Sequence, residues 1–505
     1  MHKQMTRDPR ARVKPLVVCL AIALGVAGGF GTGSSTAVAS EPATRWPAFP
    51  HTTEPRGARR AVHGDLLAPG GAEGAADKAP GRPDGAANIP VTNCNDDGPG
   101  SLRDAVQNVA ISGDTVDMTG LACSTITLTS GTILVASDDL TIIGPGNDMS
   151  GVTIDAGHNS EIFVHVGAGT LTLESMTVLN GGKYVAGDDY AFGGCVYSAG
   201  NVSLIATGVK YCVAAADGDG LAKAGGVFAA HSLSVLSSVI SGNEARAAAS
   251  FALAGGIYAK ESLVVNYSWL HDNTASAATL GNGVGGAIRS KGDVTILNST
   301  ISANTADQAA GAELLGNYST QDFEVGNTTI YGNYAYQSTH GSGLYVGGDA
   351  VISNCTITGN VSRKSSDEKQ GTGLNIAGYS TTRLESSIVS ANLLYTGANF
   401  LSDDIGVRHG LLAGGTNNLV GSSTQLLPAD TIRSYDPGLG HLTSGNGGRT
   451  PTMIPLPGSP ALNTGNNVLN RLYDQRGPGY PRVIGRPDIG AVESDTIFAS
   501  GFESE

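Results

Sequence analysis

Residues 255–288 read GGIYAKESLVVNYSWLHDNTASAATLGNGVGGAI, and this stretch contains one full period of an internal repeat. A double glycine opens it, a β-branched run follows, and an apolar residue stands three positions before Asn273. The double glycines recur every 30 to 32 residues, opening at Gly193, Gly225, Gly255 and Gly285. This interval predicts a solenoid, in which each unit buries its apolar face against the next.

The second mark of the repeat is an asparagine that follows an apolar residue by three positions. Because the rest of the unit varies while this polar residue returns, we expect an inward asparagine that hydrogen-bonds to its equivalent in the next coil. Cys212 takes the same place in one unit, and Asn180 is a looser match. The predicted ladder consists of Asn180, Asn243, Asn273, Asn304, Asn333, Asn360 and Asn392.

Short β-branched segments lie between these two marks, for example residues 262–266 and 293–297. Each is bounded by Gly, Asn or Asp, and no helical period of useful length accompanies them. Three strands per coil, stacked into three parallel sheets, satisfy the pattern, so the predicted fold is all-β, a right-handed parallel β-helix. A propeller or a leucine-rich repeat would need signatures that the chain lacks.

Other segments carry the resemblance to known families. The alternation of GGxI or GGxY with (I/V/L)xxN over about residues 160–395 resembles the repeats of secreted right-handed parallel β-helix proteins, including polymorphic outer membrane protein repeats. Residues 101–106, SLRDAV, resemble the CSLREA-type motif at the start of many exported β-helix proteins. Residues 435–493, with YDP, GSPALN, DQRG and DIGAVE in order, resemble the choice-of-anchor Q segment of bacterial exported proteins. The resemblance implies a pectate-lyase-like solenoid exported by a bacterium, a fold that hosts both lyases and adhesins.

Six segments follow along the chain. Residues 1–39 have a basic start, an apolar stretch and a small-residue cleavage site, which predicts a signal peptide. Residues 40–88 are predicted to be a disordered linker or pro-segment, 89–124 an N-terminal cap, and 125–395 the parallel β-helix. Residues 396–493 are predicted to hold the last coils and the choice-of-anchor Q-like segment, and 494–505 a tail that either sorts the protein or is disordered.

The cap is expected to contain a short amphipathic helix that covers the first coil. Leu102, Ala105, Val106 and Val109 share one helical face after Ser101, which stands at the N-cap position. An open β-helix exposes strand edges at each end, and such a helix would protect them.

Five of the six cysteines remain after removal of Cys19 with the signal peptide. Export permits disulfides, and we expect Cys94 to pair with Cys123, while Cys195–Cys212 is a second pair that the spacing allows. Because five is odd, at least one thiol is unpaired or bonds between chains. The partners of Cys195, Cys212 and Cys355 stay open.

The composition is acidic, with 44 Asp plus Glu against 30 Lys plus Arg and a net charge of −14, which argues against a nucleic-acid partner. No apolar run after the signal peptide reaches membrane-spanning length, so the mature chain is expected to be secreted or held at the bacterial surface. The oligomeric state is left open.

No residues assemble into a catalytic motif at the level of sequence. The acidic pairs at 138–139, 188–189 and 403–404 point to opposite faces if they lie on strands, so turn residues or Ca²⁺ ligands are the simpler interpretation. The DGDG at 217–220 lacks the rest of an EF-hand, so no cofactor is predicted, and Ca²⁺ has no specific motif. The histidines are scattered, at His165, His231, His271, His340, His409 and His441. A charged set near the C-terminus suggests an ion-pair network, or a site for a carboxylate or polymer: Asp474, Arg476, Arg482, Arg486, Asp488 and Glu493.

The function hypothesis rests on the segments between each asparagine and the next glycine. Residues 244–254, 274–284, 305–310, 334–342 and 361–372 are expected to be variable loops leaving one edge of the solenoid, where repeat proteins commonly bind their partners. The side chains proposed to contact sugar or protein are Tyr334, Tyr336, His340, Arg363 and Lys364. The chain is therefore predicted to be a non-catalytic, adhesin-like protein that binds a glycan or a cell-surface component. The alternative is a polysaccharide lyase or glycoside hydrolase acting on an acidic polysaccharide.

Overall fold

The computed structural model describes residues 86–279, 282–316, 322–337, 339–364, 366–378 and 380–494. The predicted signal peptide, residues 1–39, lies outside the described residues, and so do residues 40–85 of the predicted linker and 495–505 of the predicted tail. Within the described residues no helix is long and apolar enough to cross a membrane.

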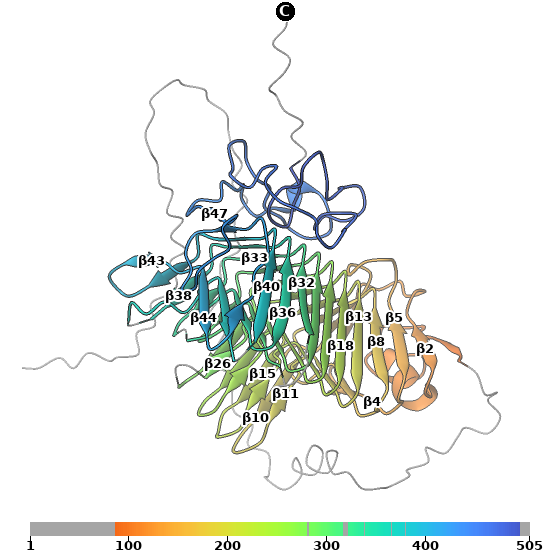
Figure 1. Cartoon of the computed structure of the whole chain (residues 1–505). Helices are drawn as coiled ribbons and strands as arrows, with labels where there is room; N and C mark the ends of the chain where they lie inside the picture. Colours follow the sequence, from red (N-terminus) through yellow and green to blue (C-terminus); the bar gives the residue numbers. More distant parts are fainter. Residues whose placement is uncertain are drawn as a thin grey trace, which may run out of the picture. The chain divides into compact units, whose positions relative to one another are not determined.

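The described chain winds into a parallel β-helix, which confirms the predicted fold class. Three sheets run along the solenoid, and every strand in them pairs in parallel with its equivalent in the next coil. Figure 1 shows the longest visible sheet as a row of strands from β2 to β40. Two further sheets stand beside these three.

The strands, in their order within each sheet, are as follows. Sheet A contains β1 (Asn88–Pro90), β2 (Asp114–Asp117), β5 (Leu140–Ile143), β8 (Thr170–Glu174), β13 (Asn201–Ile205), β18 (Ser232–Leu236), β23 (Ser262–Asn266), β28 (Asp293–Leu297), β32 (Asp322–Gly326), β36 (Asp349–Ser353), β40 (Thr381–Glu385) and β45 (Leu411–Leu412). Sheet B contains β3 (Thr125–Thr127), β6 (Thr153–Asp155), β9 (Thr177–Leu179), β14 (Gly208–Lys210), β19 (Val239–Ser241), β24 (Trp269–His271), β29 (Thr300–Ser302), β33 (Thr329–Tyr331), β37 (Thr356–Thr358), β41 (Ile388–Ser390), β46 (Leu419–Val420) and β47 (Ile432–Arg433). Sheet C contains β4 (Ile133–Val135), β7 (Phe163–His165), β12 (Val196–Ser198), β17 (Val227–Ala229), β22 (Ile257–Ala259), β27 (Ile288–Ser290), β31 (Ala312–Leu314), β35 (Leu344–Val346), β39 (Leu374–Ala377) and β44 (Ile405–Arg408). Sheet D contains β10 (Gly182–Val185), β15 (Val213–Ala216), β20 (Glu244–Ala247), β25 (Thr274–Ala277), β30 (Thr305–Ala306), β34 (Tyr334–Ala335), β38 (Val361–Arg363), β42 (Leu393–Tyr395) and the antiparallel β43 (Phe400–Ser402). Sheet E contains β11 (Ala191–Phe192), β16 (Ala222–Lys223), β21 (Ala252–Leu253) and β26 (Gly283–Val284).

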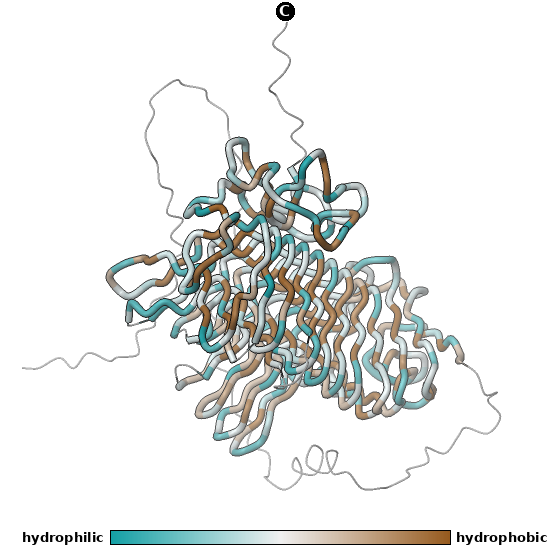
Figure 2. The backbone as a smooth tube through the Cα atoms, viewed as in Figure 1, coloured by the Kyte–Doolittle hydropathy of each residue, from teal (hydrophilic) through white to brown (hydrophobic). Residues whose placement is uncertain are grey.

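The core lies inside the coils and is built by stacking equivalent residues. In β23, Leu263 and Val265 point inward and are almost fully buried, while Val264 between them is exposed. Leu263 is paired with Val294 of the next coil, so like residues contact like residues along the axis. Hydrophobic and hydrophilic positions alternate along the strands for the same reason (Figure 2).

All five segments predicted to be loops instead contain paired strands, since residues 305–310, 334–342 and 361–372 contribute β30, β34 and β38 to sheet D. Residues 244–254 and 274–284 contribute β20, β21, β25 and β26, so the coils carry up to five strands where three were predicted. The reason is that small side chains alternate there, which lets sheets D and E face each other across a layer of alanines that includes Ala214, Ala245 and Ala252. We call this two-sheet projection the fin; its strands β10, β11 and β15 extend from the coils in Figure 1.

The N-terminal segment contains the expected short helix, in two parts. Helix α2 (Leu102–Asp104) follows Ser101, whose hydroxyl accepts a hydrogen bond from the Asp104 N–H, and continues as the π-helical turn η2 (Ala105–Val109). Leu102, Ala105 and Val106 are buried as predicted, but Val109 is 45% exposed, because the π-helical turn rotates it away from the predicted face.

Two disulfides join Cys94 to Cys123 and Cys195 to Cys212. Cys355 is the free cysteine of the described chain, and burial raises the pKa of its thiol to about 12. A buried, protonated thiol is a core residue, since the thiolate is the reactive form.

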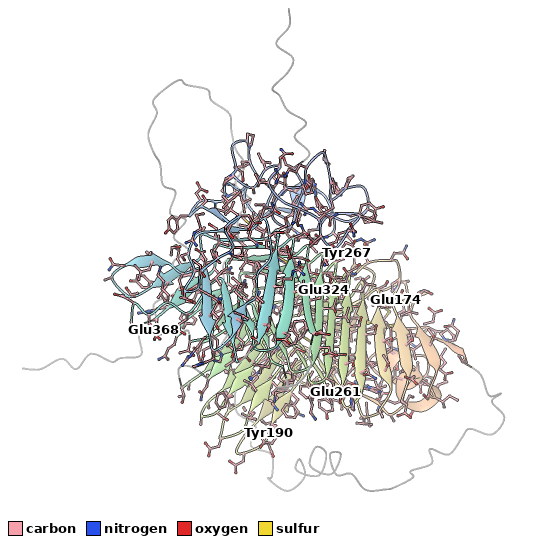
Figure 3. All side chains as sticks on the ribbon, in the orientation of Figure 1. Glu174, Tyr190, Glu261, Tyr267, Glu324 and Glu368 are labelled. Carbon is pink, nitrogen blue, oxygen red and sulfur yellow. A yellow bond between two sulfur atoms is a disulfide. The ribbon has the colours of Figure 1, made fainter. Side chains whose placement is uncertain are left out.

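The C-terminal segment, residues 435–494, lies along the turns between sheets A and B and includes the short 3-10 helix η3 (Ser444–Asn446). The Gln475 amide donates to the Ser299 carbonyl at 3.0 Å, and the Ala491 N–H donates to the Thr356 hydroxyl at 3.0 Å. The Arg471 guanidinium lies 2.7 Å from Glu324 of sheet A, which Figure 3 labels. The segment is therefore bonded to several coils.

Candidate functional site

The outer surface of sheet C carries one row of side chains, which we call the outer row. The middle residue of each strand points outward, and the register pairs each with the next. The outer row consists of Tyr197, Phe228, Tyr258, Arg289, Glu313, Tyr345 and Asn375. In chain order, its first three residues are aromatic, and the residues from Arg289 onward are mostly polar or charged.

The aromatic part of the outer row is covered by the fin. The rings of Tyr197 and Phe228 are stacked at 5.6 Å between centroids, and Phe228 and Tyr258 at 5.4 Å. Phe192 of the fin stacks on Phe228 at 4.8 Å. Because all three rings of the row are buried, they join the fin to the coils.

Four cations gather where the aromatic part ends, and we call Lys223, Lys260, Arg289 and Lys291 the basic cluster. Lys223 reaches from the fin over the rings, with Nζ 5.0 Å from the Phe192 centroid and 5.8 Å from that of Tyr258. Burial, together with repulsion from the other three cations, lowers the pKa of Lys223 to about 8.

Three members of the basic cluster have no carboxylate at ion-pair distance among the described residues. The described lysines that form ion pairs are Lys183 and Lys364, on other sheets. Arg289 is the paired member, with Nε 2.7 Å from the Glu313 carboxylate. Unpaired, partly exposed cations suit an anionic ligand, and a lysine whose pKa is about 8 can also accept a proton once it is neutral.

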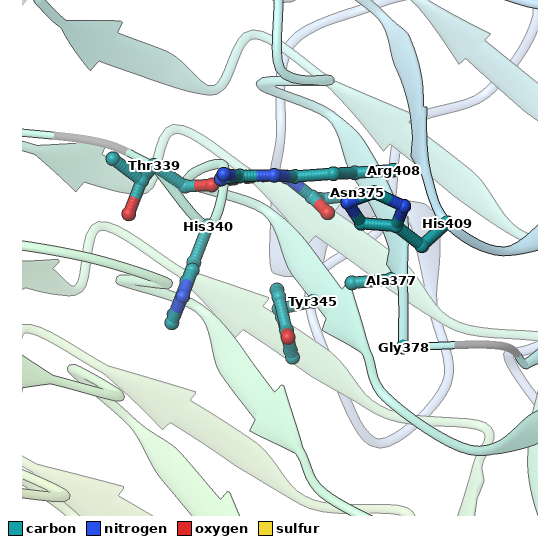
Figure 4. A pocket seen from close by; sticks show the side chains of 8 residues that line it. All are labelled: Thr339, His340, Tyr345, Asn375, Ala377, Gly378, Arg408 and His409. Carbon is teal, nitrogen blue, oxygen red and sulfur yellow. Dashed lines mark hydrogen bonds between the residues drawn. The ribbon is translucent and has the colours of Figure 1, made fainter.

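Beyond the basic cluster the outer row opens into a hollow. Glu313 is 1% exposed and lies between Arg289 and His340, whose Nδ1 is 3.2 Å from the carboxylate. The His340 ring lies 4.4 Å from that of Tyr345, and the two stand side by side in Figure 4. The hollow has a volume of about 240 Å³ and is lined chiefly by Thr339, His340, Tyr345, Asn375, Arg408 and His409.

The residues predicted to contact a ligand fall on two surfaces. His340 lies in the hollow, as just described. The other four belong to sheet D or follow it. Tyr334 and Tyr336 contact each other edge to face at 4.9 Å, and Arg363 lies 6.0 Å from the Tyr395 ring centroid. Lys364 is bonded to Glu368 at 2.9 Å.

Sheet D presents an exposed surface that we call the aromatic face, made of Tyr334, Tyr336, Arg363, Tyr395 and Phe400. Tyr336 is 39% exposed and Phe400 60% exposed. Phe400 belongs to the antiparallel strand β43 and packs on Tyr395 at 4.8 Å. Exposed rings with an arginine among them can stack on a sugar or an apolar partner.

Six of the seven predicted ladder asparagines form one buried column. In each the side-chain Nδ2 donates to the Oδ1 of the next at 2.9 to 3.0 Å, from Asn243 through Asn273, Asn304, Asn333 and Asn360 to Asn392. The Cys212 N–H donates to Asn243 at one end, and Asn392 donates to the carboxylate of Asp404 at the other. Burial raises the pKa of Asp404, while these hydrogen bonds act against the rise.

Asn180 does not belong to this column, so its prediction is wrong. It stands one residue earlier in the coil, at the turn position with φ +52°, and its Nδ2 donates to Asp155 at 3.0 Å. Asparagine tolerates the left-handed region better than most residues, which explains why it occurs at this turn. Cys212 occupies the column position of the next coil and is bonded to Cys195.

Residues of two of the acidic pairs accept hydrogen bonds from backbone N–H groups. Asp138 and Asp139 accept from the N–H groups of Ala168 and Thr170. Asp403 is buried and accepts three backbone N–H bonds from residues 370–372. Within the described residues no group of three or more His, Cys, Asp or Glu is placed to hold a metal ion.

The charged residues near the C-terminus form a buried network, except for Arg486, which is exposed. Arg476 contacts Asp474 at 2.7 Å and Arg482 contacts Glu493 at 2.9 Å. Burial raises the pKa of Glu493 to about 7, against the opposing effect of Arg482. The network holds the C-terminal segment together.

The sequence interpretation missed the basic cluster. Its signal was present, since Lys260 and Lys291 each directly follow an equivalent strand, 31 residues apart, and Arg289 pairs with Tyr258 in register. Lys223 gave no such signal, because it comes from the fin, which was expected to be a loop.

The chain was compared with protein-family models, curated proteins and solved structures. No family model matches the chain, and no curated protein matches it. Among solved structures, the crystal structure of pectate lyase Pel9A matches with 14% sequence identity and a TM-score of 0.42, covering 81% of this chain and 96% of that one.

Proposed function

We propose that this protein binds an acidic polysaccharide, without cleaving it, along the outer surface of sheet C at the basic cluster. The observation that carries the proposal is that three lysines without ion-pair partners among the described residues, Lys223, Lys260 and Lys291, gather with Arg289 in a chain of net charge −14. Like charges repel one another, so such a cluster is costly unless an anion is bound there.

A polymer suits the site better than a small ion. The members of the basic cluster come from consecutive coils, which are spaced by about 4.8 Å, and the polar part of the outer row continues along the same axis. A chain of uronate sugars lying along the axis would present carboxylates to the lysines and ring faces to the surface beside Tyr258. Its affinity should fall with added salt.

The test is glycan binding by the chain lacking residues 1–85. We expect Lys260→Gln with Lys291→Gln to weaken binding of polygalacturonate or alginate about tenfold, which corresponds to about 1.4 kcal/mol. The matched control is Lys210→Gln on sheet B, which removes a positive charge on another face. Equal affinity of the double variant and the control would contradict the proposal.

A second candidate function, polysaccharide lyase, is favoured by the pKa of Lys223, which is about 8. A neutral lysine amine can remove the proton next to a uronate carboxylate; the C–H electrons form a C=C bond as the glycosidic C–O bond breaks, and the leaving oxygen takes a proton from solvent. Ultraviolet absorbance of the new double bond decides between the candidates. Cleavage by the wild type that is lost in Lys223→Arg, with binding retained, would replace the first proposal by the second.

We propose that the aromatic face is an additional contact surface for a glycan or cell-surface partner, as the prediction for Tyr334, Tyr336, Arg363 and Lys364 implies. Its support is the exposure of Tyr336 and Phe400. Tyr336→Ala should reduce binding to cells or polysaccharide. Unchanged binding by this variant would remove the aromatic face from the proposal.

Localisation outside the cytoplasm is also proposed, with residues 1–39 as a cleaved signal and 435–493 as an anchor-related segment. The two disulfides support it, because such bonds persist in oxidising compartments. Fractionation of the producing cells tests it, and a wholly cytoplasmic protein with reduced cysteines would contradict it.

A further inference from the structure

The hollow on sheet C lies on the same surface as the basic cluster, two to three coils further along. Tyr345 is two coils from Arg289 in register and Asn375 three coils, a distance of about 10 to 14 Å at the usual strand spacing. Figure 4 shows Arg408 extending along the hollow toward Thr339, with His340 and Tyr345 to one side of it.

Asn375 gives the hollow its polar floor. The side chain is 0% exposed, and its Nδ2 donates to the Gln370 carbonyl at 2.6 Å. Its Oδ1 is buried and has no hydrogen-bond partner among the described residues. Because a buried acceptor without a donor is unfavourable, this atom suits a ligand that brings a hydroxyl or N–H group.

The charged residues that line the hollow indicate which acidic or basic group the ligand carries. Arg408 is exposed, lines the hollow and has no carboxylate at ion-pair distance among the described residues. Two acids lie near the hollow: Glu313 is already held by Arg289 and His340, and Glu368 is paired with Lys364 at 2.9 Å and interacts with Arg408 only at longer range. A guanidinium that is not engaged by the protein favours a carboxylate, which it can bind through two parallel N–H donors.

We propose that the hollow is a subsite for one uronic acid residue, whose carboxylate binds Arg408 and whose ring hydroxyl donates to Asn375 Oδ1. The ring then lies against His340 and Tyr345, which are half-buried and in contact with each other. This inference rests on the proposed function, since it takes the subsite to read one sugar of the same acidic polysaccharide.

The experiment measures binding of sodium D-glucuronate and of D-glucose by calorimetry, in parallel with binding of the polymer. The wild type should bind glucuronate at least tenfold more tightly than glucose. Arg408→Gln should weaken glucuronate binding at least tenfold, while Arg383→Gln, an exposed arginine on sheet A, should change it less than twofold. Asn375→Asp, which places a charge against the carboxylate, should abolish binding.

The outcomes separate this inference from the proposed function. Polymer binding that depends on Lys260 and Lys291 but is unchanged in Arg408→Gln would overturn the subsite and leave the proposed function intact. No glucuronate binding by the wild type would also overturn the subsite. Glucuronate binding that depends on Arg408, without any polymer binding, would retain the subsite and refute the polysaccharide proposal.

Discussion

Replacing Asn304 by alanine tests whether the asparagine column stabilises the solenoid. The Asn304 side chain takes part in four hydrogen bonds: Nδ2 donates to the Leu270 carbonyl at 3.0 Å and to Asn333 Oδ1 at 2.9 Å, and Oδ1 accepts from the backbone N–H and the side-chain amide of Asn273 at 3.0 Å each. Alanine removes all four, in a place that water does not reach, since the residue is 0% exposed.

The magnitude follows from the groups left behind. The Asn273 backbone N–H loses the acceptor that the structure gives it, and the Leu270 carbonyl loses a donor; each buried group left unpaired costs about 1 to 3 kcal/mol. Asn333 Oδ1 keeps the Asn304 backbone N–H, and Asn273 Nδ2 keeps the Ile240 carbonyl. We therefore expect Asn304→Ala to lower the free energy of unfolding by about 2 to 6 kcal/mol, the sum for the two groups.

Urea unfolding followed by tryptophan fluorescence measures this change. Trp269 lies in β24, one coil from Asn304, and Trp46 is the other tryptophan of the chain, so a Trp46→Phe background reports on the solenoid alone. Asn266→Ala is the matched control, because Asn266 Oδ1 also accepts from an asparagine, Asn298, but on the half-exposed outside of sheet A. The control should cost less than about 0.5 kcal/mol. Equal unfolding midpoints for Asn304→Ala and the control would refute the stabilising role of the column.

Three further predictions concern charge and cross-linking. Anion binding should weaken as the pH rises through about 8, where Lys223 loses its charge, and Lys223→Arg should bind equally at pH 7 and pH 9.5, because arginine stays protonated; a fall in both proteins would exclude Lys223 as the cause. Glu493 has its pKa raised from 4.5 to about 7 in the folded chain, so its contribution to stability is complete below pH 4.5 and is lost as the pH rises through about 7; proteolysis of the C-terminal segment should increase over that interval in the wild type and not in Glu493→Gln. Cys195→Ser with Cys212→Ser opens a loop closed across 17 residues and should lower the free energy of unfolding by about 3 kcal/mol, read from the urea midpoint; an unchanged midpoint would mean that the reduced chain is equally constrained.

The coils and the column could be predicted because their physics is local to the repeat. Equivalent residues of successive coils touch, so Leu263 needs an apolar partner 31 positions later, and Val294 is there. The buried amide of Asn273 likewise needs another amide, and Asn304 supplies it. Such requirements are visible in one sequence, because each unit carries the same constraint.

The fin and the basic cluster could not be predicted in the same way. Residues 244–254 and 274–284 looked like loops because alanine and small polar residues give no strand signal by themselves; they pair only because two alanine-lined sheets meet. Lys223 acquires its neighbours through that pairing, so nothing close to it in sequence indicates its role. Asn180 was misplaced for a related reason, since a shift of one residue moves a side chain from the column to the turn.

The position of the candidate site follows from the lengths of the coils. From Asn273 to the turn residue Gly285 the chain takes 12 residues, enough for β25 and β26 and so for the fin, whereas from Asn304 to the equivalent turn residue, Ala309, it takes only 5. Sheet E therefore ends at β26, so the fin stops at the coil that carries Arg289. Aromatic residues occupy the row where the fin packs on it, because a buried row without charges needs packing. From the last coil of the fin onward the row carries charged and polar residues, and the buried Glu313 is paired there with Arg289 and His340. A single shortened coil thus ends the packing interface between the fin and sheet C, directly beyond the coils that carry the unpaired lysines.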